Sequence, residues 1–207
     1  MLASNSSADL PETRAIAGAA DVLRRGGVVV YPTETLYGLG VDATNPLALG
    51  RLVVLKGREP GKPISVLVAD ETMLSELAAE VSPLARRLVR RFWPGPLTLV
   101  LPARPGVSDL LTGGTGTIGV RVSSHPVATA LVVAVSRPVT SPSANPAGCA
   151  PPVTVDDARG YFGTTVDAYL DAGRLPGEPA STVVDVRDGL RVVREGAVPA
   201  AVLRAAA

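Results

Sequence analysis

Apolar residues along the chain alternate between helical spacing and short continuous runs. The first helical face after Pro11 is formed by Ile16, Ala19, Ala20 and Leu23. Gly26 ends this pattern, and the apolar run 28–31 then predicts a buried strand. A loop is expected over 32–46, because Pro32 ends the strand and Asn45-Pro46 is a turn signal, and a short helix is expected at 47–55.

The same alternation continues to the end of the chain. Further helices are predicted at 72–80, 83–92, 126–135 and 154–161, and further strands at 64–68, 97–101, 117–122, 139–141, 166–170, 182–186 and 190–194. Ser82 and Ser124 are expected to cap two helices, and Thr154 with Asp157 forms a capping-box pattern. Asp188-Gly189 predicts a hairpin between the last two strands. The fold class is therefore α/β with a mixed sheet.

Composition bounds the class of protein. The 207 residues contain neither an internal repeat nor a linker, so we expect one domain over residues 1–207, with 1–10 a disordered tail and no second C-terminal domain. Cys149 is the only cysteine, which excludes a disulfide framework and favours a cytoplasmic location. The apolar runs are shorter than the ~20 residues that span a bilayer, and the N-terminus has no secretion signal. A formal net charge of +1 gives no overall attraction for nucleic acid.

The segment Lys56-Gly57-Arg58, followed by Lys62-Pro63, places three cations among turn formers before an apolar strand. Lysine and arginine are the side chains that bind phosphate, so this loop predicts an anion site. Lys56 and Arg58 are expected to face solvent when no ligand is bound. The spacing is not that of a P-loop, because only three residues separate the two glycines and proline follows the lysine. A solvated surface cluster is the alternative.

Polar groups elsewhere offer partners for such an anion. Ser141, Ser143 and Asn145 share one face of a segment that prolines stiffen. Thr33-Glu34-Thr35 follows the first strand, where ligand groups of α/β sheets often lie. Arg121 stands in an apolar strand and is expected to have an anionic partner. The alternative for the 141–145 segment is an ordinary turn, and that for Thr33-Glu34-Thr35 is a helix or turn cap. The alternative for Arg121 is a surface position on an edge strand.

Other candidate groups are interpreted structurally. His125 is the single histidine and lacks a nucleophile-elbow motif, so it is expected to pack at a helix N-terminus rather than to catalyse. Glu34, Asp42 and Asp185 do not have the spacing of a recognised magnesium cage. A solvated helix face, with RNA contact as the alternative, is the interpretation of Arg86, Arg87, Arg90 and Arg91.

The order of these motifs closely resembles the YrdC-like family of threonylcarbamoyl-AMP synthases. The resemblance runs from Gly26 to about Gly196. It is carried by Tyr31–Gly40, the Lys56/Arg58 pair, Gly119–Val122 with His125-Pro126, Ser143-Ala144-Asn145, Ser181–Asp185 and Val193–Gly196. Each segment alone is only modest evidence for the family, but six segments in this order are a highly specific signature of it.

This resemblance implies a twisted, open, mixed β-sheet flanked by helices, with a concave ligand groove. It also implies a nucleotidyltransferase that condenses L-threonine, bicarbonate and ATP to threonylcarbamoyl-AMP and pyrophosphate. Magnesium would accompany ATP, without a metal site of the protein's own. The product would pass to a tRNA threonylcarbamoyltransferase complex for tRNA threonylcarbamoyladenosine formation, and contact with tRNA or double-stranded RNA is a further implication.

The family motifs also imply a set of contacts. ATP would be bound by Lys56, Arg58, Lys62, Thr117, Ser143, Asn145, Pro151 and Arg194, with Lys56 and Arg58 as the catalytic residues. Threonine would be bound by Thr35, Arg121, Ser141 and Ser181. Three positions depart from the family pattern, namely Glu59, Leu67 and Ala147. The alternatives are a paralogue of the same fold with another acyl or carbamoyl substrate, and a non-catalytic double-stranded RNA-binding module.

Overall fold

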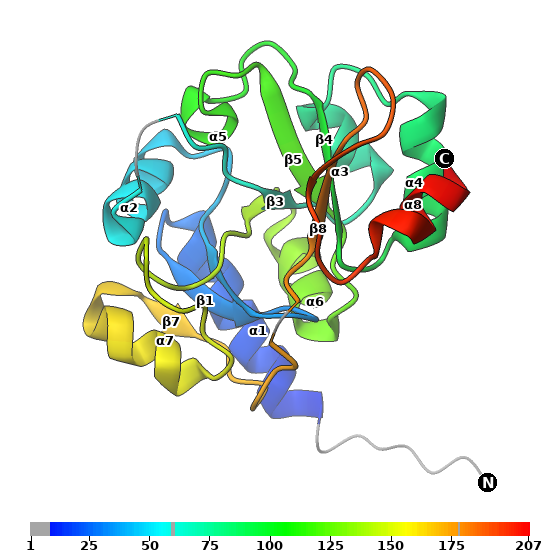
Figure 1. Cartoon of the computed structure of the whole chain (residues 1–207). Coiled ribbons are helices and arrows are strands. Elements are labelled where there is room, and N and C mark those ends of the chain that lie inside the picture. The colour runs from blue at the N-terminus through cyan, green and yellow to red at the C-terminus, as the bar shows by residue number, and fades with distance from the viewer. Residues whose placement is uncertain (1–8, 59–60, 178) are drawn as a thin grey trace, which may run out of the picture.

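The computed structural model describes residues 9–58, 61–177 and 179–207, with side chains from Glu12 onward, so Glu59 lies outside the described residues. The helices are α1 Asp9–Arg24, α2 Pro46–Lys56, α3 Glu71–Leu77, α4 Pro83–Phe92, α5 Asp109–Thr112, α6 Pro126–Val135, α7 Val155–Phe162 and α8 Ala200–Ala206 (Figure 1). The strands are β1 Val29–Pro32, β2 Tyr37–Gly40, β3 Val66–Leu67, β4 Leu97–Pro102, β5 Thr117–Arg121, β6 Val139–Thr140, β7 Ala168–Tyr169, β8 Thr182–Asp185 and β9 Arg191–Arg194.

The strands form two mixed sheets that meet along one edge. The smaller sheet has the order β2-β1-β7, and the larger has the order β6-β3-β5-β4-β8-β9. Single bridges, Gly38 with Ser143 and Asp42 with Val139, connect β2 and the segment after it to β6 and the segment beyond it. The predicted α/β class with a mixed sheet is confirmed, and the one expected sheet is divided at this junction.

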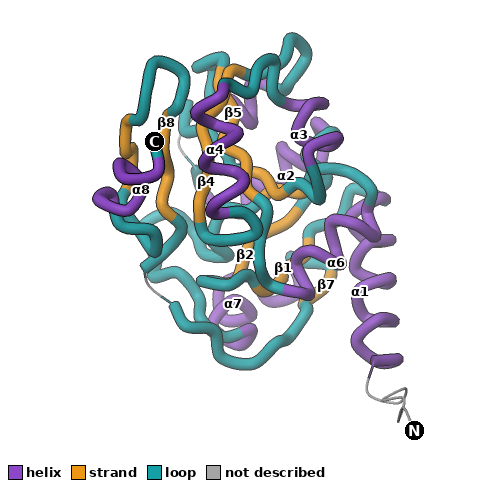
Figure 2. Tube along the Cα trace, turned by 90° about the vertical axis from the view of Figure 1, so that its right-hand side faces the viewer, coloured by secondary structure: helices purple, strands orange, loops and turns teal. Residues whose placement is uncertain are grey.

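Both sheets share one hydrophobic core. Leu23, Tyr31 and Leu39 belong to the same cluster of buried side chains as Leu88 and Leu99. Helices α1 and α6 lie side by side and contact β1, whereas α4 contacts α8 at the other end of the molecule (Figures 1 and 2). The core therefore fixes the two sheets relative to each other.

Local signals explain where α2 begins and ends. The Asn45 side chain accepts hydrogen bonds from the N–H groups of Leu47 and Ala48, at 3.0 and 3.2 Å. Gly57 ends the helix in the left-handed conformation, with φ 55°, which glycine adopts without strain. Lys56 is therefore the last helical residue, and the chain turns sharply before Arg58.

Most predicted elements are confirmed, including the Ser82 cap and the Thr154–Asp157 capping box. The cap of α6 was expected at Ser124 and is His125 instead, because its Nδ1 accepts the Val127 N–H at 3.3 Å. Two short helices, α5 and α8, lie outside the predicted elements.

Strand β2 contradicts the predicted loop over 32–46. Its sequence, Tyr-Gly-Leu-Gly, hides the strand pattern because two of its four positions have no side chain. These glycines make room for the Tyr31 ring on the neighbouring strand: a Cβ at Gly40 would lie 2.8 Å from that ring. β1 and β2 consequently form a tight antiparallel pair, and the connection between them carries Thr33, Glu34 and Thr35.

Candidate functional site

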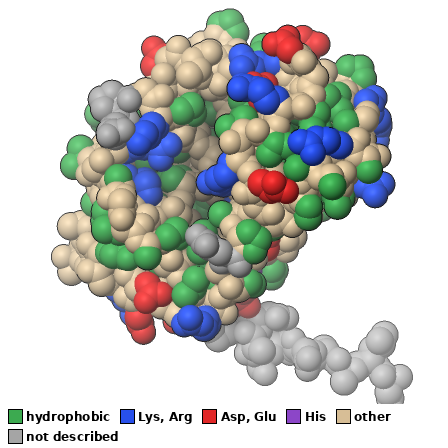
Figure 3. Space-filling model, in the orientation of Figure 1, with side chains coloured by type: hydrophobic (Ala, Val, Ile, Leu, Met, Phe, Trp, Pro, Cys, Tyr) green, Lys and Arg blue, Asp and Glu red, His purple; other side chains and the backbone are tan. Residues whose placement is uncertain are grey.

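A cavity of about 620 Å³ lies between the two sheets. Ligand cavities in proteins commonly measure about 300–1,000 Å³. Figure 3 shows a hollow in the middle of this face, with lysine and arginine side chains on both sides of it. Ten of the predicted contact residues line the cavity: Thr35, Lys56, Arg58, Thr117, Arg121, Ser141, Ser143, Pro151, Ser181 and Arg194.

The floor of the cavity is one face of the larger sheet. Thr117, Gly119 and Arg121 alternate along β5 and line the cavity, whereas Ile118 and Val120 between them are fully buried in the core. The adjacent β4 contributes Thr98 and Val100 in the same way, with fully buried Leu99 between them. These floor residues on β4, and Gly119, were not predicted as site residues, although the period-two alternation of a strand signals them.

Lys56 is buried, with 5 % of its surface exposed, contrary to the expectation that it faces solvent. Its Nζ donates to the backbone carbonyls of Ser143 and Asn145, each at 2.6 Å. Burial, together with the nearby Arg58 guanidinium, lowers the pKa of Lys56 to about 8. Lys56 thus joins the C-terminal end of α2 to the 143–145 segment while presenting its charge to the cavity.

Arg58 lines the cavity beside Lys56 and is half-buried, so the solvent-facing expectation holds only in part for it. Its Nε donates to the carbonyl of Lys62 at 3.1 Å, and Nη2 donates to the carbonyl of Pro63 at 2.5 Å. Burial lowers the pKa of Arg58. These bonds keep the guanidinium close to its own loop.

Two predicted ATP contacts do not line the cavity. Lys62 is exposed outside the lining. Asn145 is buried, with 7 % of its surface exposed, and its amide donates to the carbonyls of Pro146 and Cys149, at 3.0 and 2.8 Å. Within the described residues, the Oδ1 atom of Asn145 accepts no hydrogen bond. Asn145 therefore shapes the loop that receives Lys56.

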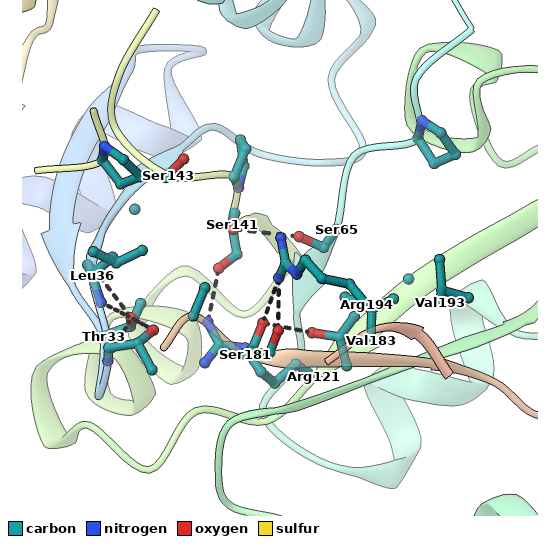
Figure 4. A pocket seen from close by; sticks show the side chains of 18 of the residues that line it. Thr33, Leu36, Ser65, Arg121, Ser141, Ser143, Ser181, Val183, Val193 and Arg194 are labelled. Carbon is teal, nitrogen blue, oxygen red and sulfur yellow. Dashed lines mark hydrogen bonds between the residues drawn. The ribbon is translucent and has the colours of Figure 1, made fainter. Parts of the chain in front are cut away.

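Arg121 has the anionic partner that its apolar strand predicted. Its Nη1 donates to a carboxylate oxygen of Glu34, and its Nη2 donates to the Ser141 hydroxyl at 3.2 Å. Figure 4 shows the Ser141 side chain directed towards Arg121. The second oxygen of Glu34 accepts from the Ser123 hydroxyl. Arg121 is thus held at the cavity floor by Glu34 and Ser141.

Arg194, the last residue of β9, lines the cavity on the side opposite Lys56. Its Nη2 donates to the carbonyl and the hydroxyl of Ser181, at 2.8 and 3.3 Å (Figure 4). The Ser181 hydroxyl also lies 3.3 Å from that of Thr98 on β4. Burial, and then the neighbouring Arg121 charge, lower the pKa of Arg194. Two guanidinium groups that repel each other across one cavity favour an anion between them.

Taken together, the described lining carries four cations, Lys56, Arg58, Arg121 and Arg194, against the carboxylate of Glu195. Glu195 accepts the Ala200 N–H at 2.8 Å, so part of its hydrogen-bonding capacity is already used. Thr35 contributes a hydroxyl 3.3 Å from that of Thr33. The arrangement suits a ligand that has several negative charges and polar groups.

The remaining candidate groups lie elsewhere. His125 lies at the N-terminus of α6, as interpreted from the sequence, and is outside the cavity lining. Arg86, at 3.6 Å from Glu71, and the other arginines of α4 are exposed. Among the residues that the structure describes, no group of three or more His, Cys, Asp or Glu side chains is placed to hold a metal. Within the same residues, no helix is both long and apolar enough to cross a bilayer.

Comparison with known sequences identifies relatives of this chain. The Sua5_yciO_yrdC family model, described as "Telomere recombination", matches residues 21–196. A threonylcarbamoyl-AMP synthase of Halorhodospira halophila is 42 % identical over 171 residues, which cover 83 % of this chain and 88 % of the relative. The family model spans every residue described as lining the cavity, from Thr33 to Glu195.

Two solved structures have the same fold. Pyrococcus abyssi Sua5 complexed with L-threonine aligns with a TM-score of 0.87 and 36 % identity, covering 90 % of this chain. The alignment covers 55 % of the P. abyssi chain, so this chain spans little more than half of that protein. E. coli YciO aligns with a TM-score of 0.81 and 31 % identity, covering 89 % of this chain and 90 % of its own. The chain therefore belongs to the Sua5/YciO/YrdC family.

Proposed function

We propose that this protein is an L-threonylcarbamoyladenylate synthase, which condenses L-threonine, bicarbonate and ATP to threonylcarbamoyl-AMP and pyrophosphate. The observation that carries the proposal is that Lys56, Arg58, Arg121 and Arg194 line one cavity, together with serine and threonine hydroxyls. Relatives named threonylcarbamoyl-AMP synthase, and the L-threonine complex of P. abyssi Sua5, support the choice of substrates.

The ATP phosphates are assigned to the Lys56 and Arg58 side of the cavity. A lysine point charge and a forked guanidinium are complementary to phosphate oxygens. Ser143, Pro151, Thr117 and Arg194 line the same cavity and are assigned to the rest of the nucleotide. Asn145 acts indirectly in this proposal, because its backbone carbonyl and its loop hold Lys56.

Threonine is assigned to the end formed by Arg121, Ser141, Thr35 and Ser181. The Arg121 guanidinium provides a charge-assisted site for the amino-acid carboxylate. The three hydroxyl groups donate or accept as needed and suit the polar side chain and the amino group of the substrate. Arg194 is bonded to Ser181, so it lies where the two substrates would meet.

In this scheme the threonine amine takes up bicarbonate to form a carbamate, with release of water. A carbamate oxygen then attacks the α-phosphate, and pyrophosphate leaves, which makes the enzyme a nucleotidyltransferase. The protein contributes positioning and charge neutralisation rather than a covalent nucleophile. Lys56 and Arg58 are the catalytic residues, since they would neutralise the charge that develops on the phosphates.

Magnesium is proposed to enter with ATP as part of the substrate complex. The phosphates supply oxygen ligands of the type that magnesium prefers. The product, a mixed anhydride, is proposed to pass to a tRNA threonylcarbamoyltransferase complex in the cytoplasm for the modification of tRNA. A reactive mixed anhydride requires an acceptor enzyme, and this requirement supports the proposed transfer to that complex.

The test is pyrophosphate release from ATP, with threonine and bicarbonate omitted in turn and threonylcarbamoyl-AMP identified by mass spectrometry. Release should require both co-substrates. Release that is indifferent to threonine would contradict the proposal and indicate a paralogue with another acyl or carbamoyl substrate. RNA binding that weakens steeply with salt, without pyrophosphate release, would indicate the RNA-binding alternative.

A further inference from the structure

Glu34 lies beside the cavity wall and has no role in the reaction proposed above. Its side chain is 14 % exposed, and that of its partner Arg121 is 6 % exposed. One carboxylate oxygen accepts from Arg121 Nη1, and the other accepts from the Ser123 hydroxyl. Glu34 itself is absent from the residues that line the cavity. It can therefore act on a ligand through Arg121, which does line the cavity.

The contacts of Arg121 fix the plane of its guanidinium. This group is rigid and planar and carries five N–H donors. Glu34 engages one terminal nitrogen, and Ser141 accepts from the other at 3.2 Å. Arg121 lines the cavity, so the donors that remain are available to a ligand carboxylate. The direction of these donors depends on where Glu34 holds the group.

Glu34 is in turn anchored at the N-terminal end of α6. The Ser123 hydroxyl donates to Glu34, and the same hydroxyl oxygen accepts a hydrogen bond from the backbone N–H of His125 at 3.2 Å. The Ser123 carbonyl accepts from the Thr129 hydroxyl at 3.0 Å, one turn into the helix. The Glu34 carboxylate therefore links three parts of the fold: the loop between β1 and β2, strand β5 and helix α6. Because these elements pack in the core, the anchor is rigid.

We propose that Glu34 is a positioning residue, which sets the orientation of Arg121 and so determines how tightly the carboxylate of the amino-acid substrate is held. The inference rests on the proposed function. A purely structural ion pair would join the same elements but would not affect threonine more than ATP. The two interpretations therefore differ in the selectivity of the effect.

The experiment compares Glu34→Gln and Ser123→Ala with the wild-type protein. Glu34→Gln keeps the shape of the side chain and removes its charge, so we expect the KM for threonine to rise about tenfold while the KM for ATP stays within about twofold. Ser123→Ala should produce a smaller change in the same direction. Asp42→Asn is the matched control, because Asp42 is a buried carboxylate that pairs with Arg137 at 2.7 Å outside the cavity lining. It should lower Tm without changing the ratio of the two KM values.

A second readout does not depend on the reaction. The ¹⁵N NMR signals of the Arg121 guanidinium should be resolved in the wild-type protein, where rotation is restricted, and should broaden or merge in Glu34→Gln. Unchanged signals, or an equal rise of both KM values, would overturn the positioning role. Failure of the proposed function would instead appear in the wild-type protein, as pyrophosphate release without threonine.

Discussion

Lys56 and Arg58 are two residues apart, but their surroundings differ. Lys56 is buried and donates to two carbonyls of the 143–145 segment, whereas Arg58 is half-buried and bonds to carbonyls of its own loop. Lys56→Ala should therefore reduce both activity and stability, the latter by about 1–3 kcal/mol. Arg58→Ala should reduce activity by roughly 10- to 150-fold, from a lost contact of about 1.5–3 kcal/mol, and change stability by under about 1 kcal/mol.

Urea unfolding and pyrophosphate release on the same preparations measure the two effects. Lys56→Met is a suitable control, since it keeps much of the apolar stem and removes only the charged donor. Equal stability of Lys56→Ala and Arg58→Ala would show that the bonds from Lys56 to the 143–145 segment contribute nothing to folding.

The depressed pKa of Lys56 predicts a pH dependence. Its pKa falls from 10.5 to about 8 because the charged form is buried. Below pH 8 the lysine is charged and binds phosphate, and above pH 8 the free enzyme loses that charge. We expect kcat/KM for ATP to fall as the pH rises past about 8, approaching a tenfold loss per pH unit. In Lys56→Arg, which stays charged, this fall should disappear below pH 10.

The same shift has the opposite consequence for stability. Between about pH 8 and 10.5 an unfolded lysine binds a proton that the folded Lys56 has lost. The unfolded state then binds more protons, so the contribution of Lys56 to the free energy of unfolding increases as the pH rises through this window. The difference between wild type and Lys56→Met, measured by urea unfolding at pH 7 and pH 10, isolates that contribution; a constant difference would contradict the shift.

At the scale of elements, glycine occupies different strand positions for different physical reasons. A Cβ at Gly38 or Gly40 would lie 3.1 or 2.8 Å from the Tyr31 ring, so packing within the protein excludes a side chain there. A Cβ at Gly119 would meet Thr98 and Ser65 only at 3.4 and 3.7 Å, and its φ is not in the left-handed region. Neither the backbone nor packing requires glycine at position 119. The space it leaves belongs to the cavity floor.

Gly119→Val should therefore separate binding from folding. The branched side chain suits a strand, so the free energy of unfolding should stay within about 1 kcal/mol of the wild-type value, while its methyl groups fill the floor and raise the KM values at least severalfold. Gly119→Ala adds one methyl at ordinary contact distance and should have a milder effect. Gly50→Ala, on α2 where a Cβ meets nothing within 4 Å, is the control for substitution alone. Wild-type KM values in Gly119→Val would contradict this role.

Elements with a regular pattern of side chains were predictable, and those without one were not. α4 has a Ser82 cap, a proline at its first turn and apolar residues on one face, and its predicted bounds match the structure. β2 has glycine at two of four positions, so its strand character depends on Tyr31 in another element. The burial of Lys56 likewise depends on carbonyls 87 and 89 residues further along the chain, which no local pattern records.

At the scale of the whole molecule, the cavity exists because two sheets meet without merging. The β1–β2 connection and the end of α2 form one wall, and strands β4, β5 and β8 with the adjoining 179–181 segment form the floor and the opposite wall. The 141–143 segment runs along the junction and reaches both sides. Any substitution that loosens the junction is expected to affect every substrate contact at once.

Thr140 is one of the side chains that join the two sheets at this junction. It is fully buried on β6, its hydroxyl donates to the Leu39 carbonyl at 3.0 Å and accepts the Val41 N–H at 2.9 Å. Thr140→Val keeps the shape of the side chain but leaves the Leu39 carbonyl and the Val41 N–H without this hydrogen-bond partner. The free energy of unfolding should fall by about 2–4 kcal/mol as a result.

Thr140→Ser is the matched control, because it retains the hydroxyl and loses one methyl group, at a cost of about 1 kcal/mol. Urea unfolding should order the proteins as wild type, Thr140→Ser and Thr140→Val, with one cooperative transition in each because both sheets share a core. The KM values for ATP and threonine should rise together in Thr140→Val, unlike the selective change expected for Glu34→Gln. If Thr140→Val were as stable as Thr140→Ser, the hydroxyl would not be what couples the sheets, and the junction would depend on packing around Tyr31 and Val139 instead.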